Sequence, residues 1–306
     1  MRNLVVTFAL LFAAMGSCAQ AEEDCRLQLA ATLPMTMDQT GRMSVPVAVG
    51  DHPLRLMIDT GATSSTLTKN AAEALGLQQH LVMAPFMFRI YGGEHLTHYV
   101  RVKDFTLGEM RDPKAEFLVM ENQPSPGIDG LLGWDFLSQF DVDLDFANAK
   151  LNFFLHHRCD GRAVYWTQDE SAIAKISFDL DEQHDQHIVI PVKIDGHEIK
   201  AIVDTGAARS PLDLDIALSL FDLKTGSEGM QRIGSPSDSD PSYRYPFKTL
   251  TFEGVTVNNP AIVLVPVEKS HFEKRRMLLG IGVLSQLHLY IAYKERMLYV
   301  TPASAH

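Results

Sequence analysis

The two halves of this 306-residue chain repeat one another. The matching segments occur in the same order, at a nearly constant offset of 145 to 147 residues. They are Val45-Pro46-Val47 with Ile190-Pro191-Val192, Met57-Ile58-Asp59-Thr60-Gly61-Ala62 with Ile202-Val203-Asp204-Thr205-Gly206-Ala207, and Leu132-Gly133 with Leu279-Gly280. Such ordered self-similarity predicts two copies of one structural unit, related by a pseudo-two-fold axis within one chain.

Each copy has the pattern of a β-rich unit. Residues 44–49 and 187–194 are short runs rich in β-branched residues, and each ends at a turn dipeptide of Gly and Asp. A second strand then leads into Asp-Thr-Gly. Helical composition is confined to short stretches, at residues 69–77, 134–140 and 281–287. Residues 141–154 and 288–300 are predicted to form closing hairpins, whereas 122–129 and 235–245 have the composition of loops.

The first 21 residues are predicted to be a signal peptide. Arg2 precedes an apolar run at residues 4–15, and Ala19-Gln20-Ala21 is a small-x-small cleavage site. The apolar run is too short to span a bilayer stably. We therefore expect cleavage after Ala21, export to the periplasm or the exterior, and no transmembrane segment in the mature chain. An alternative is a lipid anchor on Cys18, because Gly16-Ser17-Cys18 resembles part of a lipoprotein signal.

After cleavage the chain keeps two cysteines, Cys25 and Cys159. In an oxidising compartment an isolated pair favours a disulfide, which would join the N-terminal arm to the segment between the halves. The alternative is two separate buried thiols.

Several classes of function find no support in the sequence. A net charge of −11 argues against nucleic acid as a partner, because phosphate binding needs a basic surface. The twelve histidines include no H-E-x-x-H pair, and the sequence contains no Walker loop, G-x-G-x-x-G or G-x-S-x-G. We therefore expect no metal and no cofactor.

The duplicated Asp-Thr-Gly points to chemistry. One such tripeptide occurs by chance in turns, but two at equivalent positions of a repeat would bring Asp59 and Asp204 together at the axis. Two carboxyl groups about 3 Å apart cannot both ionise easily, so they share one proton and supply a base and an acid in one site. Such a pair titrates as a unit.

The neighbouring residues fit the same scheme. Gly61 and Gly206 allow a tight turn beneath the carboxyl groups, with backbone amides directed at them. The hydroxyl groups of Thr60 and Thr205 can form hydrogen bonds across the axis and lock the two loops together.

These motifs resemble those of the aspartic peptidase superfamily, in particular its retropepsin-like members in bacteria. Each half carries Asp-Thr-Gly-Ala and then a hydrophobic-hydrophobic-Gly element, Leu131-Leu132-Gly133 or Leu278-Leu279-Gly280. The resemblance covers residues 40–155 and 185–301, nearly all of the mature chain. It implies an all-β, bilobal acid-protease fold of two retropepsin-like closed β lobes. In this family the hydrophobic-Gly element supports the catalytic Asp through a ψ-shaped crossing.

The resemblance also implies a flap, a hairpin that closes over the substrate. Ile90-Tyr91-Gly92-Gly93 has the glycines and the aromatic residue of a hairpin tip, and Gly234 lies at the corresponding place in the second half. The alternative for Tyr91 is an ordinary half-buried strand tyrosine.

Two departures from the family pattern have functional consequences. The residue after Asp-Thr-Gly-Ala is Thr63 in the first copy and Ala208 in the second, so we expect asymmetric substrate subsites. Ala62 and Ala207 leave no hydroxyl group to stabilise an ionised aspartate, which predicts a working pH milder than that of gastric-type enzymes.

The resulting organisation is a signal peptide at 1–21, an N-terminal arm at 22–39, a first lobe at 40–155, a linker at 156–184 and a second lobe at 185–306. The sequence predicts a monomeric aspartic endopeptidase that binds a peptide or protein substrate in an extended conformation. The alternative is a non-catalytic relative that binds peptide or glycan in the same cleft, or acts as an inhibitor. Both Asp-Thr-Gly motifs are intact, which favours the enzyme.

Overall fold

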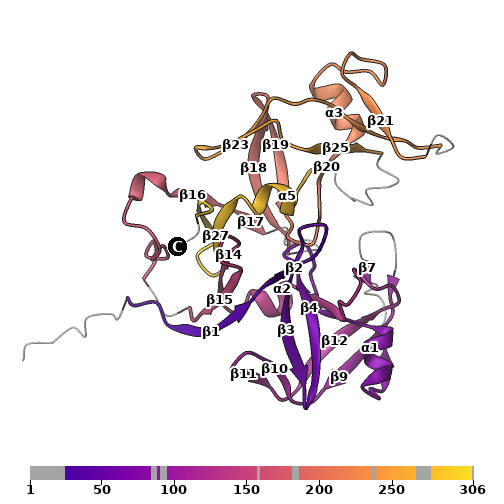
Figure 1. Cartoon of the computed structure of the whole chain (residues 1–306), viewed down its shortest axis with the longest axis vertical. Coiled ribbons are helices and arrows are strands. Elements are labelled where there is room, and N and C mark those ends of the chain that lie inside the picture. Colours follow the sequence, from indigo (N-terminus) through magenta and orange to yellow (C-terminus); the bar gives the residue numbers. More distant parts are fainter. Residues whose placement is uncertain are drawn as a thin grey trace, which may run out of the picture.

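The computed structural model shows two β lobes joined by a sheet to which both contribute (Figure 1). It describes residues 25–83, 88–89, 95–156, 159–180, 186–235, 239–266 and 277–304. The predicted signal peptide, the alternative lipid anchor at Cys18 and the flap residues Tyr91, Gly92 and Gly93 lie outside these ranges.

The first lobe is built on a ten-stranded sheet in the order β11-β10-β3-β4-β13-β5-β12-β9-β6, with β2 paired to β3. Its strands are β2 (Thr36–Met37), β3 (Met43–Val49), β4 (His52–Ile58), β5 (Thr66–Thr68), β6 (Gln79–Leu81), β9 (His98–Val102), β10 (Phe105–Leu107), β11 (Met110–Asp112), β12 (Ala115–Met120) and β13 (Gly130–Leu132). The helices are α1 (Lys69–Ala74) and α2 (Trp134–Leu137). A separate pair consists of β7 (Phe88–Arg89) and β8 (His95–Leu96).

The second lobe repeats this arrangement in the order β24-β23-β18-β19-β26-β20-β25-β22-β21, with β17 paired to β18. Its strands are β17 (Asp179–Leu180), β18 (Ile188–Ile194), β19 (His197–Val203), β20 (Ser210–Asp213), β21 (Gln231–Ile233), β22 (Ser242–Arg244), β23 (Thr249–Phe252), β24 (Val255–Asn258), β25 (Ile262–Val265) and β26 (Met277–Leu279). The helices are α3 (Leu214–Leu220) and α5 (Ile281–Leu284). The two sheets have the same connectivity, which confirms the two β-rich copies predicted from the repeat and the all-β, bilobal acid-protease fold that the resemblance implies.

The first hairpin of each lobe follows from its turn residues. The last pair of β3 and β4 is Val49 with His52, which leaves the two-residue turn Gly50-Asp51. In the second lobe the last pair is Ile194 with His197, around Asp195-Gly196. Gly50, Asp195 and Gly196 all have positive φ, as tight two-residue hairpins of the primed types require.

The short helices end earlier than composition suggests. The helix predicted at 69–77 begins with Thr68 as N-cap, whose hydroxyl accepts from the Ala71 amide, and ends at Ala74 because Gly76 adopts positive φ. The helices predicted at 134–140 and 281–287 stop at Leu137 and Leu284, since the chain must enter the strands of the joining sheet. The loop predicted at 235–245 contains a strand, β22.

The joining sheet has six strands in the order β1-β15-β14-β27-β28-β16. They are β1 (Leu29–Pro34), β14 (Asp141–Asp145), β15 (Lys150–Phe154), β16 (Ala174–Ser177), β27 (Leu287–Ala292) and β28 (Met297–Pro302). The predicted N-terminal arm therefore supplies β1, and the predicted linker supplies β16 and a short 3-10 helix, Glu170–Ala172. Antiparallel pairing of β14 with β27 connects the lobes.

The Cys25–Cys159 disulfide predicted from the sequence is present, with the Cα atoms 4.8 Å apart, and it joins the N-terminal arm to the segment after β15. Between the lobes, the buried carboxylate of Asp143 on β14 contacts His288 Nε2 on β27 at 2.6 Å. Asp143 also accepts hydrogen bonds from Asn152 and from the Tyr165 hydroxyl.

Candidate active site

The two Asp-Thr-Gly loops meet between the lobes, one after β4 and the other after β19. The Asp59 amide donates to the Leu132 carbonyl and the Asp204 amide donates to the Leu279 carbonyl, both at 3.0 Å. The hydrophobic-Gly elements of β13 and β26 therefore fix the backbone at each aspartate.

Each loop is anchored a second time. The Trp134 amide donates to the Ala62 carbonyl and the Ile281 amide donates to the Ala207 carbonyl, both at 2.8 Å. A Cβ on Gly133 would come 2.7 Å from a Ser64 backbone atom, so this glycine permits the close approach of the two segments.

Threonine side chains join the loops to one another. The Thr60 hydroxyl donates to the Val203 carbonyl at 2.8 Å, and the Thr205 hydroxyl donates to the Ile58 carbonyl at 2.7 Å. Each hydroxyl also accepts the backbone amide of the other threonine at 3.1 Å. Both side chains are buried. These four hydrogen bonds cross the lobe interface and obey the pseudo-two-fold symmetry.

The motif glycines place the carboxyl groups. A Cβ added to Gly61 would come 2.5 Å from Cγ of Asp204, and one added to Gly206 would collide with the Asp59 carboxyl group. Each carboxyl group therefore lies against the glycine of the opposite motif. This reciprocal contact brings Asp59 and Asp204 together, and no larger residue fits at either glycine.

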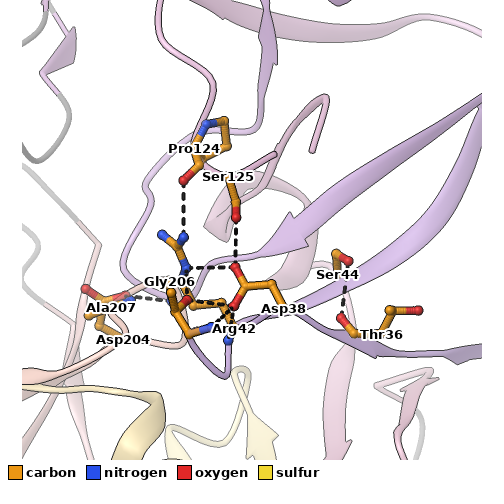
Figure 2. A network of polar contacts seen from close by, with 10 residues as sticks. Thr36, Asp38, Arg42, Ser44, Pro124, Ser125, Asp204, Gly206 and Ala207 are labelled. Carbon is orange, nitrogen blue, oxygen red and sulfur yellow. Dashed lines mark hydrogen bonds and ion pairs between the residues drawn. The ribbon is translucent and has the colours of Figure 1, made fainter. Parts of the chain in front are cut away.

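Backbone amides also orient both carboxyl groups. The Gly61 amide donates to Asp59 Oδ1 at 2.9 Å. Asp204 Oδ1 accepts from the Gly206 and Ala207 amides at 2.9 and 3.0 Å (Figure 2).

Burial among protein atoms raises the pKa of both carboxyl groups. The pKa of Asp204 is raised well above its usual value, since the negative charge of Asp59 adds to the loss of water. The hydrogen bond between the two side chains lowers the pKa of Asp59 and raises that of Asp204. Both residues still keep part of their surface exposed, so water can reach them. The arrangement suits two carboxyl groups that hold one proton between them.

Comparison with protein families shows to which family the chain belongs. The model of the aspartyl protease family matches residues 45–136 and 190–283, one segment in each lobe. The chain belongs to the aspartyl protease family.

Solved structures agree with the fold of this aspartyl protease family member. Basic 7S globulin from soybean aligns with a TM-score of 0.55 at 9% sequence identity, covering 90% of this chain and 97% of the globulin. Aspartic proteinase from Irpex lacteus aligns with a TM-score of 0.53 at 14% identity, again covering 90% and 97%. Identities this low establish likeness of fold alone. A search among curated protein sequences found no match.

Some residues that support the aspartyl protease loops were not singled out from the sequence. The buried hydroxyl of Ser65 accepts the Gly133 amide at 3.0 Å, and that of Ser210 accepts the Gly280 amide at 3.1 Å. Ser65 and Ser210 lie 145 residues apart, which is also the offset of the two aspartates. The repeat could therefore have identified them as equivalent residues that support the two loops. His187 was also missed, and its Nε2 lies 2.8 Å from the Gly61 carbonyl.

A pocket of about 260 Å³ opens in the first lobe beside the loop that follows the first motif. Its walls combine apolar side chains with two carboxylates. The lining residues are Ser64, Ser65, Val82, Met83, Tyr99, Glu116, Phe117, Leu118 and Asp135. The Asp135 carboxylate accepts from the Ser65 amide and hydroxyl, which ties this wall to the motif loop.

Of the predicted flap residues, only Gly234 is described. It follows β21, which pairs with β22, and it has a positive φ of 99°. In the first lobe β7 and β8 pair on either side of Tyr91, Gly92 and Gly93. Across the described ranges, no three His, Cys, Asp or Glu side chains are grouped so as to hold a metal ion.

Proposed function

We propose that this chain is an exported aspartic endopeptidase, in which a water molecule held between Asp59 and Asp204 hydrolyses the peptide bond. The observation that carries the proposal is the reciprocal contact of each carboxyl group with the glycine of the opposite motif. This contact holds the two acids together, and the raised pKa of both favours one shared proton.

The proposed reaction needs only these two groups and water. The ionised carboxylate takes a proton from water as the oxygen attacks the peptide carbonyl, while the protonated carboxyl group donates to the carbonyl oxygen. The tetrahedral diol collapses as the carboxyl group that took the water proton gives it to the leaving amine, while a hydroxyl of the diol returns a proton to the other carboxylate. Backbone amides of Gly61, Gly206 and Ala207 hold the carboxyl groups in place during these transfers.

We propose that the substrate binds as an extended peptide between the lobes, with main-chain hydrogen bonds like those of an added strand. The pocket beside Ser64 would take one side chain. Its apolar walls, Val82, Met83 and Leu118, favour an apolar side chain. Tyr91, Gly92, Gly93 and Gly234 are proposed to cover the bound peptide.

Export and the monomeric state belong to the same proposal. The predicted signal peptide at 1–21 and the Cys25–Cys159 disulfide support passage to an oxidising compartment. Among the described helices, none is long and apolar enough to cross a membrane. Both lobes belong to one chain, so a complete pair of aspartates needs no second copy. The boundaries at 40–155, 156–184 and 185–306 remain our proposed division.

A non-catalytic binding protein is the second candidate, because one structural neighbour is a globulin and the other a proteinase. Two intact Asp-Thr-Gly motifs favour the enzyme. The test is cleavage of a diverse peptide mixture by the mature chain between pH 3 and 8, with and without a statine-type transition-state mimic. Cleavage that the mimic blocks supports the peptidase. A folded protein that binds peptides and cuts none at any pH supports the binding protein.

A further inference from the structure

One histidine contacts the candidate active site from the opposite lobe. His187 immediately precedes β18 of the second lobe, and its Nε2 lies 2.8 Å from the carbonyl oxygen of Gly61 in the first-lobe motif. A carbonyl oxygen only accepts hydrogen bonds, so Nε2 must carry a proton. A second proton at Nδ1 then makes the ring cationic without breaking this contact.

This charge acts on one aspartate of the pair. Burial is the largest influence on Asp59 and raises its pKa, while the positive charge of His187 is among the influences that lower it. The main influences on Asp204 include no cation. They are burial, the negative charge of Asp59 and the hydrogen bond with its side chain, which raise the pKa, and the Ala207 and Gly206 amides, which lower it.

Among the described residues, the position equivalent to His187 in the repeat holds a cation that has a carboxylate partner of its own. At the offset of 145 residues, the counterpart of His187 is Arg42, immediately before β3. Its guanidinium group pairs with Asp38 at 3.3 Å and donates to the Pro124 carbonyl at 3.2 Å (Figure 2).

Asp38, the partner of Arg42, stays ionised at pH values above its lowered pKa of about 2. Burial raises the pKa of Asp38, but hydrogen bonds from Thr40, Ser125 and the Arg42 amide outweigh this effect and lower it to about 2. The charge of Arg42 is therefore compensated locally, and the environment of the two aspartates is asymmetric despite the symmetric loops.

We propose that His187 is a positioning residue, whose imidazole holds the Gly61 carbonyl across the lobe interface and places positive charge on the Asp59 side of the pair. Provided that the proposed peptidase function holds, this asymmetry gives Asp59 the role of base and Asp204 the role of acid. Among the described groups, His187 and the two carboxyl groups act on this balance, with Arg42 and Asp38 compensating each other on the counterpart side.

Two substitutions separate the contact from the charge. His187→Gln keeps an N–H that can reach the Gly61 carbonyl but cannot become cationic, and His187→Leu removes both. His52→Gln is the matched control, because His52 is exposed at the start of β4. The carboxyl carbons of ¹³C-labelled aspartate are titrated by NMR from pH 2 to 8, a readout that needs no catalysis.

We expect the lower midpoint of the coupled Asp59 and Asp204 titration to move upward in both His187 variants. The expected change in the proton affinity is about threefold to tenfold, and His52→Gln should leave the midpoint unchanged. Where the wild type cleaves peptide, the acid limb of its pH–rate profile should move by the same amount.

An unchanged midpoint in His187→Gln overturns the inference, as does an equal shift in His52→Gln. A wild type that cleaves nothing but shows the expected shift refutes the proposed function alone, and leaves the effect of His187 on the pair established. The two failures are therefore distinguishable.

Discussion

The carboxyl group of Asp204 occupies the space that a side chain on Gly61 would need, since a Cβ there would lie 2.5 Å from Asp204 Cγ. Asp59 stands in the same relation to Gly206. The requirement for glycine in Asp-Thr-Gly therefore has its cause in the opposite lobe, and not only in the turn that contains it.

Gly61→Ala should displace the Asp204 carboxyl group and separate the pair. We expect kcat/KM to fall at least about 100-fold, because a shift of about 1 Å in a reacting group has an effect of that order. Gly226→Ala is the control, since no atom lies within 4 Å of a Cβ at that exposed position. Peptide cleavage and circular dichroism would be measured for both variants. A folded Gly61→Ala enzyme with nearly wild-type cleavage would contradict the packing argument.

The buried pair of Asp143 and His288 should stabilise the joining sheet. Asp143→Asn replaces the buried carboxylate that contacts His288, Asn152 and Tyr165 with an amide, so at least one of these hydrogen bonds loses its acceptor. We expect the free energy of unfolding to fall by about 1–3 kcal/mol in urea titrations, because a buried polar group is left unsatisfied. The control is Glu116→Gln, because its ion pair with Arg101 is exposed and should contribute little. Equal stability of the two variants would show that the buried contacts of Asp143 do not stabilise the joining sheet.

The stability of the fold should depend on pH through Asp204. Its pKa is raised in the folded state by burial and by the charge of Asp59, so the folded chain holds this proton to a higher pH than the unfolded chain. The associated stability is present at low pH and is lost as the pH rises through the folded pKa. The amide side chain in the Asp204→Asn variant does not ionise, so the variant does not lose this stability as the pH rises.

We therefore expect Asp204→Asn to melt at a higher temperature than the wild type at pH 7, by at least about 2 °C, and at nearly the same temperature at pH 3. Asp51→Asn, in an exposed hairpin turn, should follow the wild type at both pH values. The measurement is thermal unfolding by calorimetry at each pH. If Asp204→Asn were less stable than the wild type at pH 7, ionisation of Asp204 would not destabilise the fold and the prediction would be wrong.

The repeat alone predicted the pair of aspartates, the loop glycines and threonines, and the two-lobed β architecture. It succeeded because symmetric duplication forces equivalent residues to meet at the axis. The joining sheet was harder to predict, since the pairing of β1 with β15 and of β16 with β28 involves segments outside the repeat.

The contact of His187 with Gly61 could not be predicted for a related reason. The repeat equates His187 with Arg42, and these two side chains have different partners. Identical offsets reveal equivalent positions but not the contacts made by unlike side chains.

The central claim is that Asp59 and Asp204 act as one catalytic unit. The most direct test compares kcat/KM of the wild type with that of Asp59→Asn, Asp204→Asn and the double variant on one cleaved peptide. We predict a loss of at least about 100-fold for each single variant and little further loss for the double variant, because neither carboxyl group works alone. A single variant that keeps wild-type activity while folded, or losses that simply multiply, would contradict the account.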